Sequence, residues 1–109
     1  MPVTMGVAQS FADDRDRVLQ ALLIVSLKPG GRVGAHPDVG PYYRSIDRFH
    51  FVIDGESWFY CGNEEQLMRT GEIWWFRNDL VHSAFNPTAS DRIHLILDLA
   101  KLTDESPPK

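Results

Sequence analysis

The chain has 109 residues, which fits a single domain over residues 1–109 and leaves little room for a second. Hydrophobic residues make up 43% and charged residues 24%, as in ordinary globular proteins, and the net charge of -4 argues against a nucleic-acid-binding surface, which is normally basic. The only cysteine, Cys61, excludes an intramolecular disulfide and favours the reducing cytoplasm as the location.

Residues 1–12 carry no clear period and are expected to form a loose arm or an edge strand. The segment Val18–Leu27 is a continuous apolar run that follows three aspartates rather than a basic stretch, so it does not read as a secretion signal. It is too short to span a membrane, and its abrupt end at a Pro-Gly-Gly turn predicts a buried strand. The proline-containing tail, residues 103–109, is expected to be disordered.

Short strand patterns then follow one another, separated by turn signals such as Asp54-Gly55 and Asn86-Pro87. The expected strands are Arg32–His36, Asp47–Ile53, Ser57–Tyr60, Gln66–Arg69, Ile73–Phe76, Val81–Phe85 and Ile93–Leu99. No convincing amphipathic helix follows residue 30. Many short strands at roughly even spacing predict an all-β fold, either a sandwich or a barrel with jelly-roll connections.

His36, Asp38 and His82 are the candidate metal ligands. His36 and Asp38 are separated by one residue, so both side chains can converge on one ion when the chain is extended or turning. His82 adds a second imidazole from a later strand. Two imidazoles and a carboxylate form a facial triad, which leaves coordination positions open and is typical of non-haem iron(II) oxygenases. Taken alone the H-x-D triplet is weak evidence, because short motifs also arise by chance.

An arginine at the start of the last expected strand strengthens this interpretation. Strand alternation puts Arg92, His94, Ile96 and Asp98 on one face and a row of apolar residues on the other. A guanidinium directed into a barrel can clamp the far carboxylate of a keto acid with two parallel hydrogen bonds. The alternative for Arg92 is a surface ion pair, which the apolar strand around it disfavours.

Arg48 and His50 share one face of the expected strand Asp47–Ile53. They would add a second cationic or hydrogen-bond donor pair, and together with Arg92 and His94 they make up the candidate cosubstrate-binding residues. The alternative is a polar face open to water, which antiparallel sheets often have.

Two further groups of residues contain large aromatic side chains outside the candidate site. Tyr42, Tyr43 and Arg44 follow the proposed triad and are candidate substrate contacts or parts of a lid, unless they form an ordinary exposed loop. The three tryptophans, at positions 58, 74 and 75, are expected to pack the barrel, because large aromatic side chains usually serve hydrophobic cores.

The stretch from Pro29 to Leu99 resembles the catalytic core of the aspartyl/asparaginyl β-hydroxylase family of 2-oxoglutarate oxygenases. The matching blocks are PGGRVGAHPD (29–38), DRFHFVID (47–54), GEIWWFRNDLVHSAFN (71–86) and DRIHLILDL (91–99). The resemblance implies a double-stranded β-helix, the jelly-roll barrel of the cupins. It also implies hydroxylation of an amino acid or peptide side chain, with Fe(II), 2-oxoglutarate and dioxygen as cofactor and cosubstrates.

The resemblance also assigns roles to single residues. It implies that His36 and His82 bind the metal, and that Asp38 stands where many family members, though not all, have a carboxylate ligand. It further implies that Arg92 binds 2-oxoglutarate, with Arg48 and His50 as additional cosubstrate contacts.

The chain departs from the family in being short for an oxygenase and in showing no flanking helices. It could therefore be a minimal enzyme, an oligomer that covers its own edges, or a core that has lost catalysis. Two other readings stay open: a metal-binding cupin without 2-oxoglutarate chemistry, and a non-catalytic binding module on the same fold. The expected partners are a small-molecule or peptide substrate and a second copy of the chain, which exposed strand edges would pair, but neither nucleic acid nor a membrane.

Overall fold

The structure is a computed structural model that describes residues 9–101, so the expectations for residues 1–8 and for the tail from 103 to 109 lie outside the described residues. Eight strands form within this range. They are β1 (Leu19–Leu27), β2 (Arg32–His36), β3 (Ile46–Asp54), β4 (Ser57–Cys61), β5 (Glu64–Met68), β6 (Ile73–Trp75), β7 (His82–Phe85) and β8 (Arg92–Ala100).

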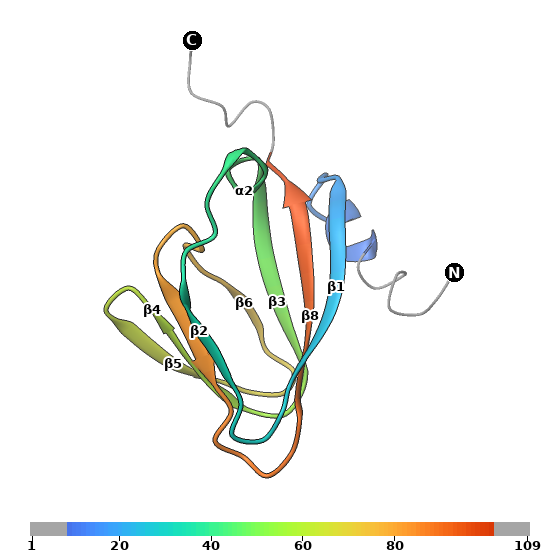
Figure 1. The fold of residues 1–109 in the computed structure, drawn as a ribbon. Coiled ribbons are helices and arrows are strands. Elements are labelled where there is room, and N and C mark those ends of the chain that lie inside the picture. The colour runs from blue at the N-terminus through green and yellow to red at the C-terminus, as the bar shows by residue number, and fades with distance from the viewer. Residues whose placement is uncertain (1–8, 102–109) are drawn as a thin grey trace.

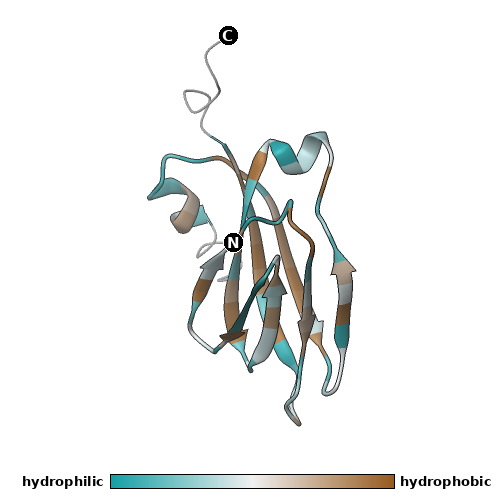
Figure 2. Cartoon of the chain, turned by 90° about the vertical axis from the view of Figure 1, so that its left-hand side faces the viewer, coloured by the Kyte–Doolittle hydropathy of each residue, from teal (hydrophilic) through white to brown (hydrophobic). Residues whose placement is uncertain are grey.

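The strands build two antiparallel sheets that face each other (Figure 1). The first has the strand order β1-β8-β3-β6 and the second the order β2-β7-β4-β5, so the chain crosses repeatedly from one sheet to the other. This architecture confirms the predicted all-β fold with jelly-roll connections. In Figure 2 the hydrophobic colours follow the strands, while the short helix α2 (Pro41–Arg44) above them is largely hydrophilic.

The predicted strands all form, with boundaries that shift by one or two residues. The largest shift is in β5, which was expected to begin at Gln66 and begins at Glu64. The preceding turn explains the shift, because Gly62 adopts a positive φ of 59° and lets Cys61 pair directly with Glu64. A turn this tight starts the hydrogen-bonded ladder immediately after the reversal.

Residues 9–13 form a helix, which corrects the expectation of a loose arm or an edge strand for this part of the N-terminal segment. Phe11 and Ala12 are buried against three leucines on the outer face of β8. The Phe11 ring also meets Phe49 and Phe51 edge-on, with centroid distances of 5.1 and 4.8 Å. Burial against this sheet stabilises a segment whose local sequence pattern gives little helix signal.

The two faces of β8 differ in chemistry. Its outer face carries the leucines covered by helix 9–13, while its inner face carries Arg92, His94, Ile96 and Asp98, as strand alternation predicts. β8 pairs with β1 on one side and with β3 on the other, which fixes its register. The inner polar side chains are therefore held in place by two neighbouring strands.

β1 and β2 each stand at the edge of a sheet, with a strand partner on one side only in the part of the chain that the structure describes. β1 has no charged residue, but only Leu27 in it is buried, and its Leu23 and Ile24 are 45% and 63% exposed, so the expectation of a buried strand is wrong. Pairing of such edges with a second copy of the chain stays a prediction. Between residues 9 and 101 no helix has the length and hydrophobicity that crossing a bilayer requires.

Candidate metal centre

The predicted triad is assembled at the end of a strand pair. His36 ends β2 and His82 begins β7, and the two residues face each other across the antiparallel ladder. Asp38 follows two residues after His36, and its backbone N–H donates to the Asn78 carbonyl at 2.8 Å. Nε2 of His36 lies 3.5 Å from Oδ1 of Asp38, and Nε2 of His82 lies 3.6 Å from Oδ2. Ligand atoms from all three residues lie within 4.8 Å of one another, so one ion could bind them together.

Backbone carbonyls fix the tautomers of both triad histidines. Nδ1 of His36 lies 2.7 Å from the Gly34 carbonyl oxygen, and Nδ1 of His82 lies 2.8 Å from that of Leu80. A carbonyl can only accept, so each Nδ1 carries the proton and each Nε2 keeps its lone pair. Metal-binding histidines are held in this way, with the second ring nitrogen donating to an oxygen. The donor set therefore fits a divalent transition metal.

A chain of polar contacts orients Asp38. Nδ2 of Asn78 donates to Oδ2 of Asp38 at 3.2 Å, and Nη1 of Arg48 lies 3.7 Å from the same oxygen. Arg48 in turn donates two hydrogen bonds to Asp98, from Nε at 2.7 Å and from Nη2 at 2.9 Å. These hydrogen bonds raise the pKa of Arg48 above its ordinary value. Arg48 thus links the deeply buried Asp98 to the candidate metal ligand.

Tyr42 completes this network from α2. Its hydroxyl donates to Oδ2 of Asp98 at 2.7 Å, and burial together with this hydrogen bond raises the pKa of Tyr42 to about 12. Tyr42 is therefore tied to the network as a neutral phenol. Alternation already placed Asp98 on the inner face, but the sequence marked Asn78, which lies in the loop before β7, only as part of a turn.

A cavity of about 220 Å³ opens between the sheets beside the triad. The polar side chains that line it include all three candidate ligands together with Arg48, His50 and Arg92. The apolar part of its wall includes Val25, Leu27, Val33, Phe59, Ala84 and Ile96. The structure therefore brings the predicted metal ligands and three of the four predicted cosubstrate residues to the wall of one cavity.

Arg92 is buried without a counter-ion. It is only 5% exposed, its Nε has no hydrogen-bond partner, and no carboxylate within residues 9–101 forms an ion pair with it. Burial lowers its pKa from the ordinary value of arginine to about 10. Gly55 allows the β3–β4 turn to close over it, because a Cβ there would lie 2.9 Å from Cα of Arg92 and the φ is +90°. A buried guanidinium without a partner is costly, so a bound anion is the natural complement.

His50 and His94 lie at different distances from this cavity. His50 lines the cavity, whereas His94 is fully buried and does not reach it. Their Nδ1 atoms are 3.0 Å apart. Burial, aided by nearby arginines, lowers the pKa of each to about 3, so both imidazoles are neutral at neutral pH. The structure thus places His94, a predicted cosubstrate residue, behind His50 rather than at the cavity wall.

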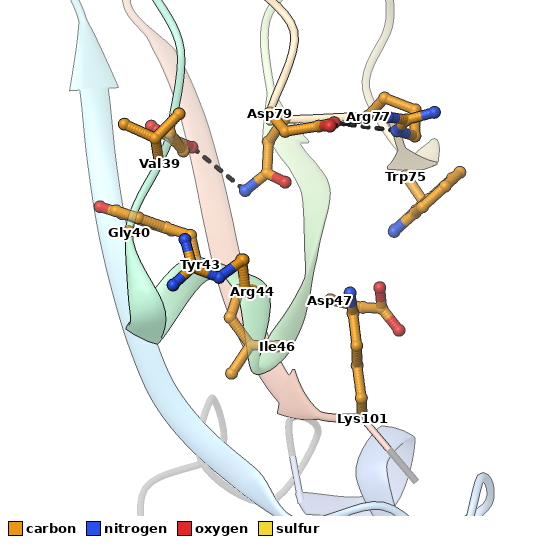
Figure 3. A pocket seen from close by; sticks show the side chains of 12 residues that line it. Val39, Gly40, Tyr43, Arg44, Ile46, Asp47, Trp75, Arg77, Asp79 and Lys101 are labelled. Carbon is orange, nitrogen blue, oxygen red and sulfur yellow. Dashed lines mark hydrogen bonds and ion pairs between the residues drawn. The ribbon is translucent and has the colours of Figure 1, made fainter. Parts of the chain in front are cut away.

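A second, wider pocket of about 430 Å³ adjoins the triad at Asp38 (Figure 3). Tyr43 and Arg44 line it from α2, and Lys101 lines it from the chain following β8. Trp75 also lines it and is 50% exposed, so the expectation that this tryptophan packs the barrel is wrong. Trp75 pairs with Phe49, on the outer face of the first sheet, and strand alternation can turn only its neighbour Trp74 inward.

Comparisons with solved structures show the cupin fold. A predicted oxalate decarboxylase from Thermotoga maritima has a TM-score of 0.62 and 19% identity, covering 76% of this chain and 68% of that one. A Klebsiella pneumoniae protein with a double-stranded β-helix domain has a TM-score of 0.59 and 19% identity, covering 79% and 84%. A cupin 2 conserved barrel protein from Salinispora arenicola has a TM-score of 0.57 and 12% identity, covering 75% and 71%. These similarities confirm the double-stranded β-helix predicted from the sequence.

Sequence comparison identifies the family. No curated protein matches the chain. The model of the aspartyl/asparaginyl β-hydroxylase family, however, matches residues 1–101, which covers both the triad and Arg92. The chain therefore belongs to the aspartyl/asparaginyl β-hydroxylase family.

Proposed function

We propose that this protein is an Fe(II)- and 2-oxoglutarate-dependent dioxygenase that hydroxylates an amino acid or a peptide side chain. One observation carries the proposal: a two-histidine, one-carboxylate donor set and an unpaired buried guanidinium line the same cavity. A metal site alone would not need an arginine, and an anion site alone would not need the triad. Membership of a hydroxylase family supports the same reading.

The donor set supports iron(II) as the metal. Two imidazole nitrogens and one carboxylate oxygen are the ligands that non-haem iron(II) oxygenases use, and they leave positions open for further ligands. His36 would supply an exposed ligand, with 46% of its side chain accessible, while His82 and Asp38 would supply buried ones. With iron(II), 2-oxoglutarate and dioxygen bound, oxidative decarboxylation of the keto acid supplies the oxidising power for hydroxylation.

The remaining residues of the cavity would bind and orient the cosubstrate. Arg92 would pair with the carboxylate remote from the metal, since its planar guanidinium can donate two parallel hydrogen bonds. His50 lines the same space and would add a neutral donor. The Arg48–Asp98 pair would hold Asp38 in position. Apolar residues on the cavity wall, such as Phe59 and Ile96, would limit the access of water.

The wider pocket beside Asp38 is the proposed entrance for the substrate. It contacts the triad through Asp38 itself, so a side chain inserted there would approach the metal. Tyr43 and Arg44 line this pocket, which supports the interpretation of this segment as a substrate contact. Arg44 and Lys101 offer positive charges that suit the carboxylate of an amino acid.

Succinate formation tests the proposal. The protein is incubated in air with Fe(II), 2-oxoglutarate and a panel of amino acids and short peptides, and succinate is measured by chromatography. We expect succinate in molar excess over the protein, and none when Fe(II) is omitted. Binding of 2-oxoglutarate without any succinate would instead identify a binding module, and metal binding without affinity for 2-oxoglutarate would identify a metal-binding cupin of different chemistry.

A further inference from the structure

A buried pair of histidines supports the wall of the cavity beside Arg92. His50 on β3 and His94 on β8 bring their Nδ1 atoms to 3.0 Å, with ring planes at 90°. Both imidazoles are neutral because burial lowers the pKa of each to about 3. Each ring therefore carries one N–H, and the short distance requires one Nδ1 to donate and the other to accept.

The surroundings of His94 decide which of the two donates. His94 is fully buried, and its Nε2 has no hydrogen-bond partner in the described part of the chain. If its Nδ1 accepted, the proton would sit on Nε2 as a buried N–H without an acceptor. If its Nδ1 donates, Nε2 keeps only an unused lone pair. Orphaned buried N–H groups are rare, so the second arrangement is favoured.

The neighbouring arginine favours the same tautomer. Arg92 precedes His94 by two residues on the inner face of β8, and its positive charge acts directly on His94. Where an imidazole nitrogen faces a cation, a lone pair is favoured over an N–H dipole. With its lone pair, Nε2 of His94 is a hydrogen-bond acceptor, whereas Nε of Arg92 is a donor. Both atoms are buried, and neither has a hydrogen-bond partner in the described residues.

We propose that His94 is a positioning residue that donates its Nδ1–H to Nδ1 of His50 and so fixes the tautomer of His50. His50 then carries its proton on Nε2, the ring nitrogen that remains for a ligand in the cavity that His50 lines. The cavity thus presents a fixed N–H donor beside the Arg92 guanidinium, and both suit a carboxylate. The identity of that carboxylate as 2-oxoglutarate rests on the proposed function, whereas the tautomer does not.

Nitrogen chemical shifts of the imidazole rings test the tautomer directly. The metal-free, ¹⁵N-labelled protein is examined at neutral pH by long-range ¹H–¹⁵N correlation, and His50 and His94 are assigned by substitution. We expect a protonated Nδ1 and an unprotonated Nε2 for His94, and the reverse for His50. The opposite assignment, with His94 protonated at Nε2, would overturn the inference.

Two substitutions of His94 test its consequence for binding. His94→Asn retains an amide N–H that can take the place of the Nδ1–H, while His94→Leu removes the donor. We expect 2-oxoglutarate to bind the Mn(II)-loaded His94→Leu protein about tenfold more weakly than the wild type, since losing an oriented hydrogen bond from His50 to the carboxylate has roughly this effect. The His94→Asn protein should bind it within about twofold of the wild type.

The two assays separate the inference from the proposed function. Equal weakening in both variants would mean that His94 only fills space, and would overturn its positioning role. A wild type with no affinity for 2-oxoglutarate would refute the proposed function, while the imidazole spectrum would still decide the tautomer. Should His94→Leu fail to fold, the spectrum of the wild type and the binding by His94→Asn would still test the inference.

Discussion

Replacing Arg92 with methionine is expected to weaken the binding of 2-oxoglutarate roughly 100-fold and to leave metal affinity within about twofold of the wild type. Arg92 is the buried guanidinium of the cavity that lacks a counter-ion within residues 9–101, so a bound carboxylate would depend on it. The triad does not contact Arg92 through any hydrogen bond or ion pair in the structure, so metal binding should survive. Calorimetric titration of the metal-free proteins with Mn(II) measures the metal affinity, and titration of the Mn(II)-loaded proteins with 2-oxoglutarate measures the cosubstrate affinity.

Although Arg92→Met should weaken 2-oxoglutarate binding, it should stabilise the ligand-free protein. Burial lowers the folded-state pKa of Arg92 to about 10, well below the ordinary value of arginine, so the fold disfavours the charged form. This penalty is fully present below about pH 10 and is relieved only as the pH rises from there toward the ordinary pKa of arginine. Arg92→Met removes the buried charge and should raise the free energy of unfolding at pH 7 by about 1 kcal/mol.

Two controls make the Arg92 result specific. Arg69→Met removes an exposed guanidinium that pairs with Glu56, and it should change neither affinity. Arg92→Lys keeps the charge without the planar fork and should bind 2-oxoglutarate with intermediate affinity. Parallel loss of metal and 2-oxoglutarate binding in Arg92→Met would show that Arg92 is structural and would contradict its assigned role.

Replacing Asp98 with asparagine should lower the free energy of unfolding by about 3 kcal/mol. Asp98 is 1% exposed and accepts two hydrogen bonds from Arg48 and a third from Tyr42. Asparagine keeps the shape but loses the charge, so Arg48 would be left without its close carboxylate partner in a largely buried position. Urea denaturation of the metal-free protein, followed by tryptophan fluorescence, measures the change.

The chain contains a matched control for this prediction. Asp79 also accepts two hydrogen bonds from one arginine, Arg77, at 2.8 and 2.6 Å, but that pair is exposed to solvent. Exposed ion pairs add little to stability, so Asp79→Asn should unfold at the same urea concentration as the wild type. A similar loss of unfolding free energy in the two variants would mean that the buried ion pair stabilises the fold no more than the exposed one, which would contradict the prediction.

Local patterns in the sequence were sufficient to predict the strands and the pairing of His36 with Asp38. Alternating and apolar runs bounded by Gly, Pro and Asn turns marked each strand, because these signals lie within a few residues of the element they define. The pairing of His36 with Asp38 could be read for the same reason. The helix at residues 9–13 could not be predicted from local patterns, since it is stabilised by leucines of β8 that lie far away in the sequence.

The sequence did not predict which side chains on neighbouring strands contact each other. Alternation placed Arg48 and Asp98 each on an inner face, but their ion pair depends on β3 and β8 being neighbours with Arg48 opposite Asp98. The order of strands in the sheets follows from the whole fold. For the same reason the sequence grouped His94 with the cosubstrate residues, whereas the structure puts it behind His50.

Anaerobic visible absorption tests most directly whether the triad and the cavity work as one site. The Fe(II)-loaded protein is titrated with 2-oxoglutarate without oxygen, with succinate as a control ligand that has no keto group. We expect a weak metal-to-ligand charge-transfer band that saturates at one 2-oxoglutarate per chain, absent with succinate and absent in His82→Ala. A folded, Fe(II)-loaded wild type that shows no band, or a band of equal strength in His82→Ala, would contradict the assignment of this site.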